Sequence, residues 1–135
     1  MAFLENLVGT GLTPETAGVL SAETVLSAPA RGANVGLTAA GTTITDALQL
    51  TAFVNVITTA AASTGVKLSS DWPIGQSGLV DNRGANALNL FPPTASIKIN
   101  GGTDGAAVTI AAAAVNYVTR LSATDFLATV AAKES

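Results

Sequence analysis

The chain has 135 residues, with six Lys and Arg against nine Asp and Glu, and its formal net charge is −3. This predicts a single folded domain without a basic surface for nucleic acid. Because the sequence contains no Cys and no His, disulfides, zinc fingers, Ser-His-Asp triads and Cys-His catalytic pairs are excluded. Only 11% of the residues are charged, whereas 26 are Ala, 18 are Thr and 13 are Gly. We therefore expect part of the small, neutral surface to be buried against other subunits.

The first 36 residues differ in pattern from the rest of the chain. Four apolar side chains at helical spacing predict one or two short amphipathic turns at the N-terminus: Phe3, Leu4, Leu7 and Val8. From Thr10 to Gly36 the apolar residues show no sustained period. We interpret residues 1–36 as an extended, mostly irregular arm. Its apolar stripe either packs on its own domain or anchors the chain to a partner, and the pattern leaves both readings open.

No targeting or membrane segment is predicted. Glu5 stands where a signal peptide needs positive charge, and the apolar run after it is short. The longest uncharged stretch, residues 47–66, contains Gln, Asn, Ser and four Thr, which favours a buried pair of strands over a membrane span. We expect a protein made in the cytoplasm that does not enter a membrane.

From Leu37 onward the apolar residues alternate with a period of two, which is typical of half-buried strands. The clearest strand is predicted at 48–56, and shorter ones at 66–68, 88–90, 97–99, 108–110, 115–121 and 124–130. Turn residues at 82–84 and 100–102 separate them, and the Gly-rich run 101–105 is interpreted as a hairpin turn. The tail 126–133 fits a strand or a helix equally. About seven or eight short strands at roughly ten-residue spacing predict an all-β fold, a single jelly-roll-like β-sandwich over residues 37–135.

Candidate chemical groups are sparse. Asp71, Asp81 and Asp104 lie far apart in the sequence and are interpreted as loop residues. No metal, cofactor or catalytic residue is predicted. Trp72 and Phe91 are the candidate interface aromatics. We favour a core edge or a subunit contact for them over a platform on which a sugar stacks.

Three stretches carry a family resemblance: Gly84–Pro93, Ile97–Gly102 and Ala106–Ala111, preceded by strand-rich segments at 37–50 and 56–68. Together they resemble small virion proteins of tailed bacteriophages, over residues 37–127. The resemblance implies a β-sandwich that trimerises on the outside of a capsid as a decoration, or cement, protein. The run Ala111–Ala114 departs from it, because related sequences commonly place a Gly turn there.

The sequence therefore predicts a non-enzymatic structural protein of the capsid exterior. Its expected partners are the major capsid protein, which the arm residues Phe3, Leu4, Leu7 and Val8 would contact, and two further copies of itself in a homotrimer. Neither nucleic acid nor a membrane is an expected partner. The alternative is a receptor- or carbohydrate-binding module of a phage fibre or tail, with Trp72, Phe91 or Tyr117 as the stacking surface.

Overall fold

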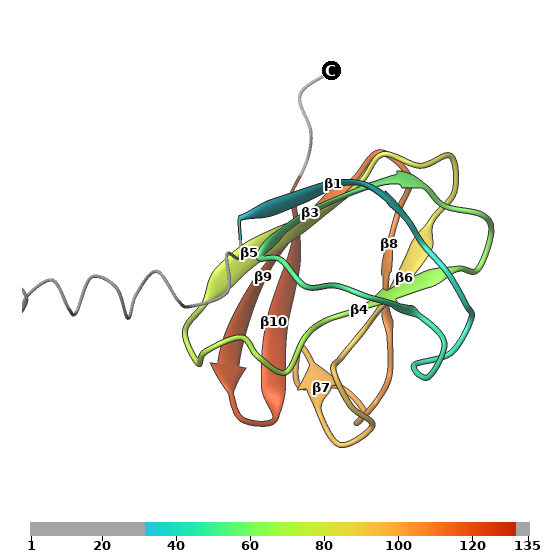
Figure 1. Ribbon diagram of the computed structural model, residues 1–135. Helices are drawn as coiled ribbons and strands as arrows, with labels where there is room; N and C mark the ends of the chain where they lie inside the picture. The colour runs from blue at the N-terminus through green and yellow to red at the C-terminus, as the bar shows by residue number, and fades with distance from the viewer. Residues whose placement is uncertain (1–31, 132–135) are drawn as a thin grey trace, which may run out of the picture. The chain divides into compact units, whose positions relative to one another are not determined.

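The computed structural model describes residues 32–131, which form ten strands and no helix (Figure 1). The strands are β1 (Ala33–Thr38), β2 (Leu48–Gln49), β3 (Val54–Thr59), β4 (Gly65–Lys67), β5 (Ser77–Asn82), β6 (Leu88–Phe91), β7 (Lys98–Ile99), β8 (Val108–Ile110), β9 (Val115–Ser122) and β10 (Asp125–Ala131). The predicted all-β class is confirmed for these residues. The stripe Phe3, Leu4, Leu7 and Val8 lies outside them.

The strands build two sheets, and the chain alternates between them from β1 to β9. The six-stranded sheet has the order β1-β3-β5-β9-β10-β7, and the four-stranded sheet has the order β2-β4-β6-β8. The pairs β1/β3, β3/β5, β2/β4 and β4/β6 are all parallel. Each pass through one strand of each sheet therefore stacks on the previous pass in the same direction. This arrangement is a β-solenoid of about four turns, and the β-sandwich predicted from the sequence is wrong.

The turns of the solenoid differ in length. In the six-stranded sheet Ala33 lies opposite Val54, and Val54 lies opposite Leu79, which are steps of 21 and 25 residues (54 − 33 and 79 − 54). In the four-stranded sheet Leu48 lies opposite Val66, and Val66 opposite Leu90, which are steps of 18 and 24 residues (66 − 48 and 90 − 66). Corner segments of unequal length absorb most of the difference, and the β1/β3 pair also contains register shifts on both sides of Leu37.

In the C-terminal part of the described chain, β8 and β9 run in the reverse direction, whereas β10 and β7 run in the same direction as β5. β8 pairs antiparallel with β6, and β9 pairs antiparallel with β5 and with β10. β7 lies in the six-stranded sheet beside β10, whereas β8 lies in the four-stranded sheet. The hairpin predicted around Gly101–Gly105 is therefore not formed between these two strands. The turn residues themselves do have positive φ, 58° at Asn100 and 67° at Gly101.

The hydrophobic core fills the space between the two sheets. Its largest fully buried side chains include Trp72, Phe126, Leu50, Ile57 and Leu68. The single strand predicted at 48–56 is in fact split, since β2 ends at Gln49 and β3 begins at Val54. Leu50 and Ala52 in the intervening corner remain buried, so the apolar alternation continues through a change of sheet.

Two strands were not predicted. β1 begins at Ala33, so residues assigned to the arm up to Gly36 are part of the first solenoid turn. β5 carries few apolar residues but is central in the six-stranded sheet, with β3 and β9 on its two sides. The tail is a strand through Ala131, within the described residues.

Candidate functional site

The outer face of the six-stranded sheet carries a group of exposed apolar side chains on β5, β9 and β10, which lie side by side in Figure 1. The register aligns Ser77 with Thr119 and Leu127, and Leu79 with Tyr117 and Thr129. Leu121 follows on β9, two residues beyond Thr119. We call these seven side chains the assembly face: Ser77, Leu79, Tyr117, Thr119, Leu121, Leu127 and Thr129.

The assembly face combines four apolar or aromatic side chains with three hydroxyl side chains, and none of the seven carries a charge. Tyr117 is 53% exposed, Leu121 48% and Leu127 38%, although these residues are among the largest apolar side chains of the described chain. None of the seven residues is Asp, Glu, Lys or Arg. Arg120 lies between Thr119 and Leu121 in β9, and its guanidinium packs 5.2 Å from the ring centroid of Phe126 in the core. The face therefore suits contact with another apolar surface.

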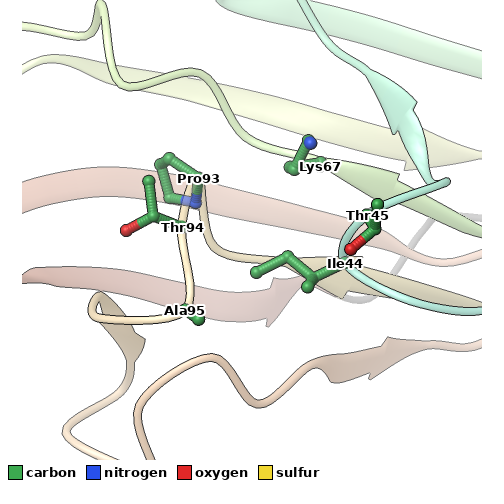
Figure 2. Close-up of a pocket in the computed structure, with 6 residues that line it drawn as sticks. All are labelled: Ile44, Thr45, Lys67, Pro93, Thr94 and Ala95. Atoms are coloured by element: carbon green, nitrogen blue, oxygen red, sulfur yellow. The ribbon is translucent and has the colours of Figure 1, made fainter.

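A second feature is a surface pocket of about 350 Å³ beside the four-stranded sheet. It is lined by Ile44, Thr45, Lys67, Pro93, Thr94 and Ala95. Figure 2 shows residues 93–95 opposite Ile44 and Thr45, with Lys67 between the two groups at the top of the view. Lys67 belongs to β4 and alternates with the fully buried Val66 and Leu68, so its side chain leaves the core side of the sheet.

Hydrogen bonds hold the loop that carries Ile44 and Thr45. Asp46 Oδ1 accepts from the backbone N–H of Thr42 at 3.0 Å, and from the backbone N–H and the hydroxyl of Thr43, both at 2.8 Å. These bonds stabilise the carboxylate and lower the pKa of Asp46 below its usual value, with the Thr43 backbone contributing most. The loop closes with a bond from Ala47 N–H to Thr43 O at 3.0 Å.

The opposite wall is a tight turn. Ile97 N–H donates to Thr94 O at 3.2 Å, and the hydroxyls of Thr94 and Ser96 lie 3.1 Å apart. Gly105 has a φ of +77°, and a Cβ there would lie 3.2 Å from Ala95 Cα and O. The close approach of Gly105 supports the turn from behind, so both walls of the pocket are held by contacts outside it.

The charge of Lys67 is the unusual property of this pocket. Four cations occur among residues 32–131: Lys67, Arg83, Lys98 and Arg120. Arg83 Nε lies 2.8 Å from Asp81 Oδ2, Lys98 Nζ lies 3.8 Å from Asp104 Oδ1, and Arg120 donates to the carbonyl oxygens of Ser70, Trp72, Ser122 and Ala123. Within this described part of the chain, the half-buried Lys67 ammonium has neither an ion pair nor a hydrogen bond.

The two candidate interface aromatics are buried. Trp72 is 1% exposed and packs edge-on against Phe53 and Phe126, with ring centroids 5.3 and 6.0 Å away. Phe91 is 8% exposed, and its ring covers Gly65, where a Cβ would lie only 2.8 Å from the ring carbon Cε2. Neither ring presents an open face in this chain. Sequence reasoning missed the assembly face and Lys67. The alternation over 115–121 groups Tyr117 and Leu121 with Val115 as one apolar face, but only the structure shows that Tyr117 and Leu121 are exposed while Asn116 and Val118 are buried.

The acids lie apart from one another. Asp81 is a buried residue of β5 paired with Arg83, not the loop residue expected, and Asp104 pairs with Lys98. Over residues 32–131, no three acidic side chains gather closely enough to hold a metal ion. The same residues contain no helix with the length and apolar character needed to span a membrane.

Comparison with known proteins gave no match to a family model, to a curated protein or to a solved structure.

Proposed function

We propose that this protein is a non-enzymatic structural protein of a tailed-bacteriophage virion, a homotrimer that binds the outer capsid surface and clamps neighbouring capsid subunits. The observation that carries the proposal is the charge-free assembly face of β5, β9 and β10, with Tyr117, Leu121 and Leu127 exposed on it. Apolar aromatic and aliphatic side chains of this kind are typical of the centre of subunit contacts.

The size of the face decides what sort of assembly it can support. It covers three strands about 4.8 Å apart and about five residues at about 3.3 Å each, a footprint of roughly 240 Å². A standard stable interface buries about 800 Å² on each partner. One face alone therefore gives a weak contact. In a closed trimer every copy makes two such contacts, and binding to a capsid lattice would add further contact area.

The capsid as partner comes from the resemblance of residues 84–93, 97–102 and 106–111 to phage decoration proteins. These segments contain β6, β7 and β8, so the similar residues occupy a solenoid and not the sandwich that the resemblance implied. We therefore retain the role on the capsid that the resemblance implied, but not the β-sandwich fold. The N-terminal stripe Phe3, Leu4, Leu7 and Val8 is the proposed contact with the major capsid protein, where each large side chain would contribute roughly 1.5–3 kcal/mol on burial.

The test is the mass of the protein in solution and its binding to heads. Light scattering coupled to gel filtration should give three times the chain mass of 13.3 kDa, and the protein should co-sediment with undecorated phage heads. The double substitution Leu121→Asp, Leu127→Asp places two charges on the face and should give monomers. Val130→Asp is the matched control, because Val130 is 66% exposed but lies on the other face of β10, in the row of the inward-facing Asn116.

A monomeric wild type at 100 μM that also fails to sediment with heads would end the proposal. A trimer that Val130→Asp disrupts as strongly as the double substitution would show that the contact lies elsewhere. The alternative, a saccharide-binding module, loses two of its three stacking rings because Trp72 and Phe91 are buried. Assembly is therefore the better supported function.

A further inference from the structure

We infer that the pocket formed by the 44–45 loop, Lys67 and the 93–95 turn binds a single saccharide unit that carries a carboxylate, with Lys67 as its cation. The inference goes beyond the proposed function and does not depend on it. The pocket belongs to the four-stranded sheet, whereas the assembly face belongs to the six-stranded sheet.

The ammonium of Lys67 carries a charge that has no partner among residues 32–131. Lys67 is half-buried between two loops, and its ammonium makes no ion pair or hydrogen bond with residues 32–131, unlike the other three cations of that range. An ammonium offers three N–H donors and no acceptor. A ligand carboxylate would accept two of these in a charge-assisted contact, which is stronger than a neutral hydrogen bond.

The walls of the pocket combine apolar and hydroxyl side chains. Ile44, Pro93 and Ala95 offer apolar contact, which suits the C–H side of a pyranose ring. The hydroxyl of Thr45 can donate and accept, as the hydroxyls of a sugar require, whereas the hydroxyl of Thr94 already lies 3.1 Å from that of Ser96. A bare carboxylate or a phosphate would use the charge of Lys67 but leave the apolar walls in contact with water. The combination selects an acidic saccharide over a simple anion.

The volume of the pocket suits a single sugar ring, and its walls are held in place before a ligand binds. A volume of about 350 Å³ is at the small end of the range of about 300–1,000 Å³ for ligand sites, so one ring fits and a long oligosaccharide would extend beyond the site. Both walls are already fixed, one by the hydrogen bonds to Asp46 and the other by the backbone of Gly105. Little ordering is then needed on binding.

The acid nearest in sequence to the pocket walls does not cancel this charge. Asp46 follows Thr45, but its Oδ1 accepts hydrogen bonds from Thr42 and Thr43. No ion pair within 4.0 Å joins it to Lys67 in the described residues. Lys67 therefore remains the charged group available to a ligand.

The test is an amide NMR titration of the full chain with D-glucuronate, D-glucose, acetate and inorganic phosphate. We expect glucuronate to bind in the millimolar range and to shift the amide signals of Thr45, Lys67, Thr94 and Ala95. Glucose, acetate and phosphate should each bind at least tenfold more weakly. Equal binding of glucose would overturn the role of the charge, and equal binding of acetate or phosphate would overturn the saccharide. No shift at these residues with glucuronate would overturn the site.

Variants separate a local from a general charge effect. Lys67→Met keeps the length and apolar stem of the side chain and should weaken glucuronate binding at least tenfold, whereas Lys67→Arg should stay within about threefold of wild type. Lys98→Met is the control, because Lys98 is also partly exposed but pairs with Asp104. If Lys98→Met loses as much affinity as Lys67→Met, the effect is net charge and the inference fails. Unchanged melting curves establish that each variant is folded.

Discussion

Asn82 joins the third turn of the solenoid to the reversed strand β8, and we expect Asn82→Ala to lower the free energy of unfolding by about 3 kcal/mol. Its Nδ2 donates to the carbonyl oxygens of Asn86, Ile110 and Ala111 at 2.9, 3.1 and 3.2 Å, and its Oδ1 accepts from Gly84 N–H at 2.9 Å. The side chain is fully buried. The two Nδ2 hydrogens are shared among three carbonyl oxygens and count as two hydrogen bonds, and the bond accepted by Oδ1 is the third. Each of the three bonds lost is worth about 1 kcal/mol net.

The matched control is Asn86→Ala. Asn86 is exposed, and its side chain makes one such bond, to Ala60 O at 2.9 Å, so a loss of about 1 kcal/mol or less is expected. Urea unfolding followed by far-ultraviolet circular dichroism measures both, with the slope unchanged if the unfolded states are alike. For a domain of this size a loss of about 3 kcal/mol corresponds to a fall of about 12–24 °C in Tm. Equal losses for the two variants would refute the reasoning that Asn82 fastens β8 to the solenoid.

Two further predictions concern single loops. Ala113 has a φ of +63°, which is unfavourable for a residue with a Cβ. Ala113→Gly should therefore raise the free energy of unfolding by about 0.5–1 kcal/mol, whereas Ala112→Gly in the same turn should lower it by a similar amount. Urea unfolding that shows both variants destabilised would contradict this. The pKa of Asp46 is lowered in the folded state by its hydrogen bonds to Thr43 and Thr42, so its stabilising contribution is complete above the unfolded value of 3.8 and is lost as the pH falls through the lower folded pKa. The difference in Tm between wild type and Asp46→Asn should therefore be largest near pH 6 and shrink below pH 3.8; a difference that stays constant down to pH 2.5 would show that the carboxylate charge is not responsible.

Local alternation of apolar residues was enough to predict most of the strands. The segments 66–68, 88–90, 108–110 and 115–121 overlap β4, β6, β8 and β9, because a strand with one buried face needs an apolar residue at every second position in any β architecture. β5 escaped detection because in Ser77–Asn82 the buried inward positions are Val80 and Asn82, and only one of them is apolar. Composition likewise indicated a neutral surface, and the charge-free assembly face is consistent with it.

The candidate site depended on which strands became neighbours. The sequence grouped Tyr117 and Leu121 on one face of a strand, but the structure was needed to show that this face is the exposed one. Leu127 joins them only because β9 pairs with β10 in a particular register. The pocket could not be predicted from the sequence, because its lining comes from three separate segments, residues 44–45, 67 and 93–95. The lack of a partner for Lys67 is a property of its surroundings in three dimensions, and no local pattern reports it.

By itself, the sequence determined where most of the strands form, and its lack of Cys and His excluded catalytic chemistry that needs those residues. It did not determine which face of β9 is buried, since Asn116 and Val118 are buried whereas Tyr117 and Leu121 are exposed. Only the tertiary structure decided that β1, β2, β3, β4 and β6 each pair with the next strand but one along the chain and not with the immediate neighbour. Alternation of period two is the same in a sandwich and in a solenoid, because both bury one face of each strand. A regular repeat would have revealed the solenoid, but its turns advance by 21 and then 25 residues in one sheet and by 18 and then 24 in the other (54 − 33, 79 − 54, 66 − 48 and 90 − 66). The unequal corners conceal the period, and the buried cluster that includes Leu50, Ile57 and Trp72 joins residues far apart in the sequence.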